Sequence, residues 1–414
     1  MDNKKTKIKN IVIAVLAVVI IACVVILVVR INTNKKNQTG DTQTETQSTY
    51  TGKRSGQFEI DYATQVTKLA DYSAIPVELS SSYEVTDDSE NEYLTSILTT
   101  YGADAYKQVT DRDTVEESDY VKVDYTGYQN GEAFDGGSAT GVLLDVAGNS
   151  QVGGTSFIEG FTKPVIGAKV GDTVQGDVTF PDDYSQSSLA GQTVTFEYKI
   201  DGIYSKDPVT LADLTDEQVN TVFGSKAGVT TVADLKTQIE KDLQQNQYSA
   251  EVDQIKQYMI DNSDVTIPDD YFAARLNEYE ESFKKDNLSD GQTLDDYLST
   301  NYNMTADDAR DKWKENLTDQ IKVEFIFGLI AEKEGIEMDE DTYNSYISYI
   351  VSASNGQMAD DNAVYEYFGS GHADEGEKYL KAQFLVNRAL DSVADNAKVT
   401  FEDTSSDSTQ TQEN

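Results

Sequence analysis

The hydrophobic pattern of this chain changes type close to Pro208, and that change constrains the fold more than any other feature. Before it, short apolar alternations are separated by glycine-rich turns, which is typical of β-strands. The alternating positions are Val121/Val123/Tyr125, Val142/Leu144/Val146, Val174/Val178/Phe180 and Val194/Phe196/Tyr198/Ile200. After it, apolar residues recur every three or four positions, which is typical of amphipathic helices. The sequence predicts an α+β chain, in which a mostly antiparallel β domain precedes an all-α region.

Several signals mark where the helices of the second part begin. The spacing of Val232 to Leu243 and of Val252 to Met259 predicts one long helix or two abutting ones. Pro268 is acceptable at a helix start, and Thr293 and Thr305 each precede an Asp by three positions, as in a capping box. Further helices are expected over residues 339–353 and 375–396. Before the β domain, residues 66–72 and 94–101 predict shorter helical pieces.

The N-terminal part of the chain predicts a membrane anchor. Residues 11–31 form an apolar run of about 20 residues, the length that a helix needs to cross a bilayer. Four lysines precede the run, so the bulk of the chain is expected outside the cytoplasm. The run is longer than a typical cleaved signal peptide, which favours an uncleaved signal anchor. Cys23 follows a short lipobox-like sequence, so a lipoprotein is a second reading.

Composition excludes several classes of function. Asp and Glu number 73 against 33 Lys and Arg, a net charge of −40 that argues against binding of nucleic acid. The sequence has one cysteine and one histidine, Cys23 and His372, so an internal disulfide, a Cys/His zinc site and a Ser-His triad are ruled out. No metal and no cofactor are therefore expected.

The domain organisation expected from these patterns has six parts. They are a cytoplasmic stub with the transmembrane anchor (1–31), a flexible polar linker (32–56), a mixed helical segment (57–115), a β domain with a short helix (116–206), a helical region (207–401) and a disordered tail (402–414).

The β domain resembles FKBP-type peptidyl-prolyl cis-trans isomerases, and among them the isomerase domain of trigger factor. The resemblance covers about residues 118–204. The pieces that carry it are Val123-Asp124-Tyr125-Thr126-Gly127, Ala133-Phe134-Asp135-Gly136-Gly137, Phe157-Ile158-Glu159-Gly160-Phe161, Val170-Gly171-Asp172, Phe180-Pro181-Asp182-Asp183-Tyr184, Leu189-Ala190-Gly191 and Val194-Thr195-Phe196-Glu197-Tyr198. The region after Leu211 resembles the helical C-terminal part of trigger factor. No Gly-Phe-Arg-rich ribosome-docking signature precedes Ser118, so ribosome binding is not expected.

The resemblance implies a set of site residues. Tyr125, Phe134, Phe157, Ile158, Phe161, Tyr184 and Phe196 would line an apolar pocket, together with Asp135 at its rim. Phe161 would be the floor under the proline ring, Tyr184 would donate a hydrogen bond to a substrate carbonyl, and the Ile158 backbone N–H would hold a second carbonyl. Tyr125 and Phe196 lie on predicted strands and could equally be ordinary core residues.

Three functions follow as alternatives. The first is an isomerase that acts on unfolded or secreted polypeptides outside the cytoplasm and has associated chaperone activity. The second is a non-catalytic holdase, and the third is a cell-surface interaction protein, for which the 25 tyrosines are a hint because tyrosine is enriched at interfaces. The complete aromatic set favours the first, with proline-containing unfolded chains as partners.

Overall fold

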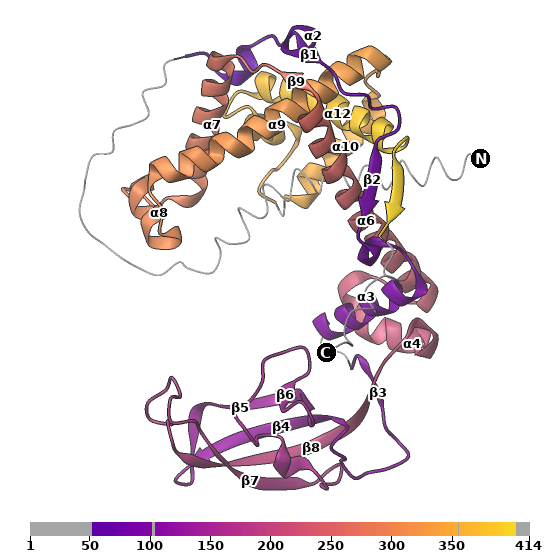
Figure 1. Cartoon of the computed structure of the whole chain (residues 1–414), viewed down its shortest axis with the longest axis vertical. Helices are drawn as coiled ribbons and strands as arrows, with labels where there is room; N and C mark the ends of the chain where they lie inside the picture. Colours follow the sequence, from indigo (N-terminus) through magenta and orange to yellow (C-terminus); the bar gives the residue numbers. More distant parts are fainter. Residues whose placement is uncertain (1–51, 102–103, 355, 403–414) are drawn as a thin grey trace, which may run out of the picture. The chain divides into compact units, whose positions relative to one another are not determined.

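The computed structural model describes residues 52–101, 104–354 and 356–402 (Figure 1). They form two compact units, one of residues 85–243 and one that joins the residues before 85 to those after 243. This grouping differs from the divisions at 116 and 207 that the sequence suggested. The expected membrane segment at 11–31 and nearly all of the expected tail lie outside the described residues. Within the described ranges, no helix is long and apolar enough to cross a membrane.

The unit of residues 85–243 is built on an antiparallel sheet, as the alternating pattern predicted. The strand order is β3-β8-β4-β5-β6, and β7 also pairs with β8. The strands are β3 (Tyr106–Gln108), β4 (Tyr120–Gln129), β5 (Glu132–Asp145), β6 (Ser150–Gln151), β7 (Thr173–Thr179) and β8 (Thr193–Pro208). Asn130 and Gly131 join β4 to β5 with φ values of 54° and 84°, the left-handed pair that a tight hairpin turn requires.

The short helix expected in this domain is a single 3₁₀ turn, η3 (Lys163–Val165). Pro164 lies inside this turn and has no N–H with which to extend a helical ladder, and Gly167 with φ of 81° redirects the chain just after it. The turn packs closely on β7. A Cβ added at Gly176 would lie 2.2 Å from Cγ of Pro164, so that strand position requires glycine.

Helical segments complete this unit. They are α3 (Asp87–Thr100), η4 (Leu211–Asp213), α4 (Asp216–Val219), the π-turn η5 (Asn220–Gly224), α5 (Ser225–Ala227) and the first part of α6 (Val232–Asn262). Leu94 and Leu98 of α3 are buried together with Phe223, Leu235 and Ile239. The helix expected over residues 94–101 is therefore present, and α6 is one continuous helix rather than two.

The other unit is mainly helical, and most of its helices begin at or near the predicted positions; α11 was not predicted from the sequence. It contains α7 (Asp269–Asn287), α8 (Leu294–Tyr302), α9 (Ala306–Glu334), α10 (Glu340–Ala353), α11 (Asp361–Phe368) and α12 (Ala373–Ala394). Pro268 is the residue before the first turn of α7. The Thr293 and Thr305 hydroxyls accept the backbone N–H of Asp296 and Asp308, each at 3.1 Å, which confirms both predicted caps.

The chain before the β domain also contributes to the helical unit. Two short helical elements, η1 (Ser55–Gln57) and α2 (Tyr62–Gln65), come first. Strand β1 (Val66–Lys68) then pairs with β9 (Asp264–Val265), and β2 (Pro76–Leu79) runs parallel to β10 (Lys398–Phe401), as Figure 1 shows; the 3₁₀ turn η2 (Ser81–Tyr83) follows. The helix predicted over 66–72 was wrong, because pairing with distant strands overrides local periodicity in so short a segment.

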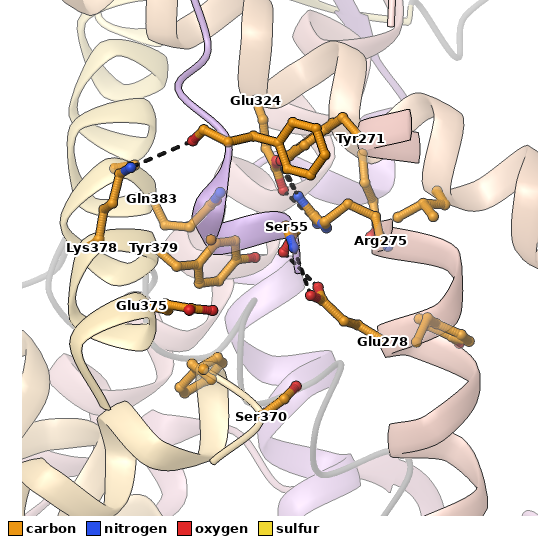
Figure 2. Close-up of a pocket in the computed structure, with 18 of the residues that line it drawn as sticks. Ser55, Tyr271, Arg275, Glu278, Glu324, Ser370, Glu375, Lys378, Tyr379 and Gln383 are labelled. Atoms are coloured by element: carbon orange, nitrogen blue, oxygen red, sulfur yellow. Dashed lines mark hydrogen bonds and ion pairs between the residues drawn. The ribbon is translucent and has the colours of Figure 1, made fainter. Parts of the chain in front are cut away.

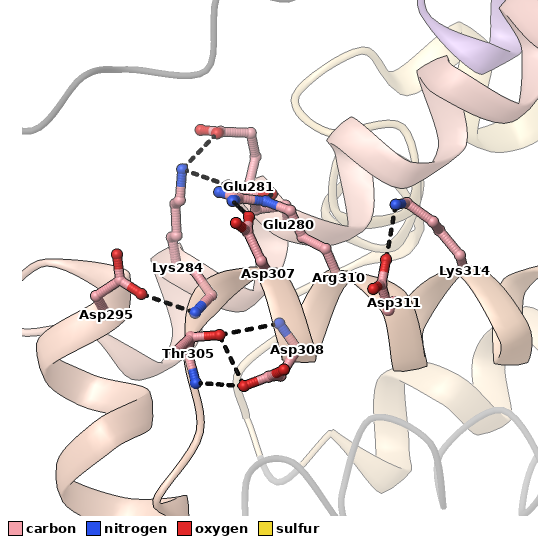
Figure 3. Close-up of polar contacts among 11 residues, drawn as sticks. Glu280, Glu281, Lys284, Asp295, Thr305, Asp307, Asp308, Arg310, Asp311 and Lys314 are labelled. Carbon is pink, nitrogen blue, oxygen red and sulfur yellow. Dashed lines mark hydrogen bonds and ion pairs between the residues drawn. The ribbon is translucent and has the colours of Figure 1, made fainter.

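Ion pairs hold α7 against the start of α9 (Figure 3). Arg310 donates from Nε and Nη2 to both carboxylate oxygens of Glu280, at 2.7 and 2.8 Å, and Lys284 reaches the same carboxylate at 2.9 Å. Glu280 is 6% exposed, and the hydrogen bond from Arg310 lowers its pKa to about 2. The buried Glu280–Arg310 pair links the two helices, while Lys284 lies on α7 itself and completes the neutralisation of Glu280.

Two carboxylates in the helical unit titrate at unusually high pH. Burial raises the pKa of Asp391, on α12, to about 6, and burial with the nearby charge of Asp395 raises the pKa of Glu251, on α6, to about 7. The Tyr248 hydroxyl donates to Asp391. Because the folded state favours the protonated carboxyls, this contribution to stability is complete below the unfolded pKa values and is lost as the pH rises through 6 to 7.

We therefore expect the unit to become more stable on mild acidification from neutral pH. The gain should be on the order of 1–2 kcal/mol, since Glu251 is partly solvated and contributes less than its shift suggests. Urea unfolding followed at several pH values measures it. Asp391→Asn should flatten the pH dependence while it retains a hydrogen-bond acceptor for Tyr248. A variant that keeps the full pH dependence would show that Asp391 is not the titrating group.

Candidate functional site

Aromatic side chains from three strands and one loop pack together beside the sheet. Tyr125 lies on β4, Phe134 on β5 and Phe196 on β8, while Phe161 lies in the segment between β6 and η3. The ring of Phe161 meets those of Tyr125 and Phe196 edge to face, at centroid distances of 5.1 and 4.9 Å. Phe134 reaches the same group through Phe196 at 5.9 Å. The structure thus brings together aromatic residues that lie far apart in the sequence.

Two glycines allow the Phe134 ring to pack closely against β4 and β5. A Cβ added at Gly127 would lie 2.6 Å from this ring and 2.7 Å from that of Phe196, and one at Gly137 would lie 2.5 Å from Phe134. Neither glycine has a left-handed φ, so close approach rather than backbone conformation requires them. Their position beside the aromatic rings gives a physical reason for the Thr126-Gly127 and Gly136-Gly137 pieces of the sequence.

The expected floor of the pocket is covered. Phe161 is 2% exposed, and the ring of Phe157 stacks on it with centroids 4.3 Å apart and planes at 20°. The hydroxyl of Tyr198 donates to the Phe161 carbonyl at 2.6 Å, which fixes the backbone beneath the ring. A proline ring can therefore reach the face of Phe161 only if the side chain of Phe157 moves aside.

The polar residues expected at the rim lie at the surface. Asp135 is exposed, and among the described residues neither its carboxylate nor the Tyr184 hydroxyl has a hydrogen-bond partner. The half-buried ring of Tyr184 packs on Phe180, with centroids 4.6 Å apart. The backbone N–H of Ile158 likewise has no acceptor among the described residues. All three groups have hydrogen-bonding capacity to offer a ligand.

Asn149 is a positioning residue that the sequence patterns did not reveal. Its side-chain amide donates to the carbonyls of Phe157 and Ile158 at 3.1 and 2.9 Å, and its Oδ1 accepts the backbone N–H of Thr162 at 3.1 Å. Its own backbone carbonyl accepts the Phe157 N–H at 2.9 Å. This residue therefore ties both ends of the segment that carries Phe161. An Asn within Gly-Asn-Ser reads only as a turn, so no sequence signal distinguishes it.

We expect Asn149→Asp to weaken any activity of the aromatic cluster without unfolding the domain. A carboxylate cannot donate, and its charge would face two carbonyl oxygens, which should displace residues 157–158. Glycine adopts the φ of 46° without strain, but Asn149→Gly also removes the side-chain hydrogen bonds. Both variants should therefore lower kcat/KM by several fold. Asn130→Gly, at another left-handed position without these bonds, is the control. Unchanged kinetics in both Asn149 variants would contradict a positioning role.

A cavity of about 420 Å³ lies in the helical unit (Figure 2). Its walls come from α7, α9, α12, the end of α11 with the turn that follows it (367–370) and the segment 55–62. The aromatic residues that line it are Phe58, Tyr62, Tyr271, Tyr279, Phe283, Phe325, Tyr367, Phe368 and Tyr379. This cavity is concave and combines aromatic walls with several polar groups, which is the character of a binding site.

Charged residues of this cavity are mostly paired with one another. Arg275 donates to both carboxylate oxygens of Glu324, at 2.7 and 3.0 Å, and its guanidinium lies 5.8 and 5.6 Å from the ring centres of Tyr271 and Tyr379. The carboxylates that line the cavity outnumber its cations. They are Glu59, Glu278, Asp286, Glu324 and Glu375, against Arg275 and Lys378. The cavity therefore combines apolar walls with negative charge.

No metal centre is found in the part of the chain that the structure describes. No three His, Cys, Asp or Glu side chains in that part are arranged to hold a metal ion. The expectation that the chain works without a metal stays a prediction.

Comparison with known proteins confirms both resemblances. Residues 112–201 match the family model described as FKBP-type peptidyl-prolyl cis-trans isomerase, and residues 231–395 match the model described as the bacterial trigger factor protein C-terminus. The chain thus carries a region of each kind, in that order. The first match contains every predicted site residue, and the second covers most of the helical unit.

The curated proteins most similar to the chain include several trigger factors. That of Bacillus cytotoxicus is 27% identical over 338 residues, which cover 80% of this chain and 72% of the relative. That of Agathobacter rectalis is 30% identical over 294 residues, covering 70% and 61%. A solved trigger factor chaperone, from a study of promiscuous substrate recognition in folding and assembly, aligns over 79% of this chain and 72% of its own with a TM-score of 0.37 and 17% identity.

Proposed function

We propose that this chain is an extracytoplasmic, membrane-anchored peptidyl-prolyl cis-trans isomerase whose helical unit holds unfolded polypeptides. The observation that carries the proposal is the cluster of Tyr125, Phe134, Phe161 and Phe196, within a region that matches FKBP-type isomerases. The match of the helical unit to the trigger factor C-terminus supports the chaperone half. Anchoring at 11–31 rests on the lysine-flanked apolar run alone.

The chemistry needs no proton transfer. The X-Pro amide must twist about its C–N bond, across a barrier of about 18–20 kcal/mol. The planar amide is more dipolar than the twisted one, so water stabilises the ground state more than the transition state. A site walled by aromatic rings removes that preference, and binding becomes tighter in the transition state than in the ground state.

Particular residues would orient the twisting bond. Once Phe157 swings off Phe161, the proline ring can lie among Phe134, Phe161 and Phe196. The Tyr184 hydroxyl and the Ile158 N–H, whose hydrogen-bonding capacity is free among the described residues, would each hold a substrate carbonyl. Asp135 at the exposed rim would orient the peptide.

A non-catalytic holdase is the second candidate, and two observations favour it. The stacked Phe157 covers the face of Phe161, and a separate aromatic cavity exists in the helical unit. Refolding of a protein limited by proline isomerisation separates the two functions. An isomerase accelerates the slow phase at a protein concentration far below that of the client. A holdase suppresses aggregation but leaves that rate unchanged.

Metal chelation should leave the isomerase activity unchanged. The proposed mechanism stabilises a twisted amide by desolvation and hydrogen bonds, and it uses no Lewis acid. Tetrapeptide assays before and after treatment with EDTA test this expectation, with added Mg²⁺ or Zn²⁺ as the reverse test. A rate that falls with EDTA and returns with metal would overturn the proposed chemistry.

The proposed location can be tested on intact cells. A protease added outside should digest the chain down to a fragment that retains residues 1–31, if the anchor is uncleaved and the bulk lies outside. Labelling with a radioactive fatty acid, compared between the native chain and Cys23→Ser, tests the lipoprotein alternative. Full protection of the chain from protease would contradict an extracytoplasmic location.

A further inference from the structure

The segment Arg54–Glu59 lies across the cavity of the helical unit as a strap between α7 and α12 (Figure 2). On the α12 side, Arg54 pairs with Glu375, with Nε 2.9 Å from Oε2. On the α7 side, the Ser55 backbone N–H donates to Glu278 at 2.7 Å, and the Ser55 hydroxyl donates to the same carboxylate. Lys378 of α12 also reaches Glu59 at 2.6 Å. The strap therefore bridges both sides of the cavity.

The strap is held to α7 and α12 through side chains, and not through backbone–backbone hydrogen bonds to either helix. Its backbone–backbone hydrogen bonds are local, from Gln57 to Arg54 and from Phe58 to Ser55. None of the residues from Gly52 to Asp61 is buried. The ring of Phe58 rests edge to face on Tyr271, at 5.5 Å. The Arg54–Glu375 pair is partly solvated, with Arg54 38% exposed, so this ion pair contributes little stability.

The chain just after the strap is held much more firmly. Tyr62 covers Gly328 of α9 so closely that a Cβ there would lie 2.6 Å from the ring. The backbone N–H of Thr266 donates to Gln65 at 2.8 Å, and buried Val66 pairs with Val265. These contacts hold the chain from Tyr62 onward without help from residues 54–59.

We propose that residues 54–59 are a displaceable cover of this cavity. Detachment would uncover the face of Tyr271, open the aromatic walls to solvent and release the carboxylates of Glu278 and Glu375 from their partners. A permanently open aromatic cavity of this size on an acidic surface would attract non-specific contacts, and a cover limits them. The proposal deepens the chaperone half of the proposed function, since the open cavity is the surface on which an unfolded client would compete with the strap.

A charge swap in the full chain tests the cover. Arg54→Glu and Glu375→Arg each place like charges at the contact and should detach the strap, whereas the double variant restores an opposite pair. The exposed pair Lys314–Asp311 on α9, 2.9 Å apart, supplies controls with the same charge changes, Lys314→Glu and Asp311→Arg. Fluorescence of the apolar dye ANS reports the accessible aromatic surface, and titration with a reduced, carboxymethylated protein reports client affinity.

We expect each single variant to raise ANS fluorescence and client affinity by about threefold or more, while the double variant and both controls stay near the original chain. The cover is refuted if the single variants bind no more ANS than the original chain. It is also refuted if they bind more ANS but hold the client more weakly, because the strap would then be a wall of the binding site. A rise in ANS without client binding by any form would support the cover and refute the chaperone function alone.

Discussion

Alanine at Phe134 or at Tyr184 is expected to lower the isomerase kcat/KM by roughly tenfold or more, which corresponds to about 1.4 kcal/mol or more of lost transition-state stabilisation. Phe134 contributes an aromatic wall beside Phe196, and its removal would admit water to the twisting amide. Tyr184 presents a hydroxyl with no partner among the described residues, suited to a substrate carbonyl. Measurement of tetrapeptide kinetics for both variants tests the site assignment.

The fold should survive both changes, because both side chains are only half-buried. Tyr120→Ala is a matched control, since Tyr120 lies on β4 but packs on Tyr106 at 4.9 Å rather than on the aromatic cluster. That variant should keep its catalytic rate. If both Phe134→Ala and Tyr184→Ala catalyse as well as the original chain, the site lies elsewhere.

The second large effect concerns stability. Glu324→Gln should destabilise the helical unit by about 3 kcal/mol, because it leaves the Arg275 guanidinium without its charged partner in a nearly dry setting. The two side chains are 11% and 13% exposed, and they form two hydrogen bonds. Urea unfolding, followed by a signal from the helices, measures the loss.

An exposed ion pair provides the comparison. Asp311 pairs with Lys314, and their side chains are 76% and 49% exposed respectively (Figure 3). Asp311→Asn removes this pair and should change the free energy of unfolding by less than about 0.5 kcal/mol. Equal losses in the two variants would mean that burial does not set the strength of the Arg275–Glu324 pair.

Local patterns predicted the elements well where periodicity and turn chemistry agreed. The predicted alternating segments between Tyr120 and Pro208 lie mainly on β-strands, and Thr293, Thr305 and Pro268 mark helix starts that the structure confirms. Those signals act within a few residues. Most of the helical elements were therefore accessible from the sequence, although α11 (Asp361–Phe368) was not predicted.

The pairing of strands that lie far apart in the sequence could not be predicted from local patterns. Strand β1 looked helical because Val66, Leu69 and Ala70 have helical spacing, yet it pairs with residues almost 200 positions away. The parallel pairing of β2 with β10 joins the two ends of the described chain in the same way. No local pattern encodes such partners, so the N-terminal segment could not be assigned to the helical unit in advance.

The sequence named the members of the aromatic cluster but not their arrangement, and their role in catalysis stays a prediction. A resemblance to known isomerases named the eight residues, and the structure brings the aromatic ones together. The resemblance could not reveal that Phe157 stacks on Phe161, because this contact depends on the position of one side chain. Asn149 was missed for a similar reason, because its role arises from hydrogen bonds to a loop that follows it in the chain.

One measurement tests the central claim most directly: the rate of cis-to-trans isomerisation of a proline tetrapeptide in the presence of catalytic amounts of the chain, compared with the spontaneous rate. The aromatic cluster predicts a rate that rises in proportion to protein concentration and falls back toward the spontaneous value with Phe134→Ala. A rate equal to the spontaneous one, from folded protein at every concentration, would contradict the claim that this chain is an isomerase.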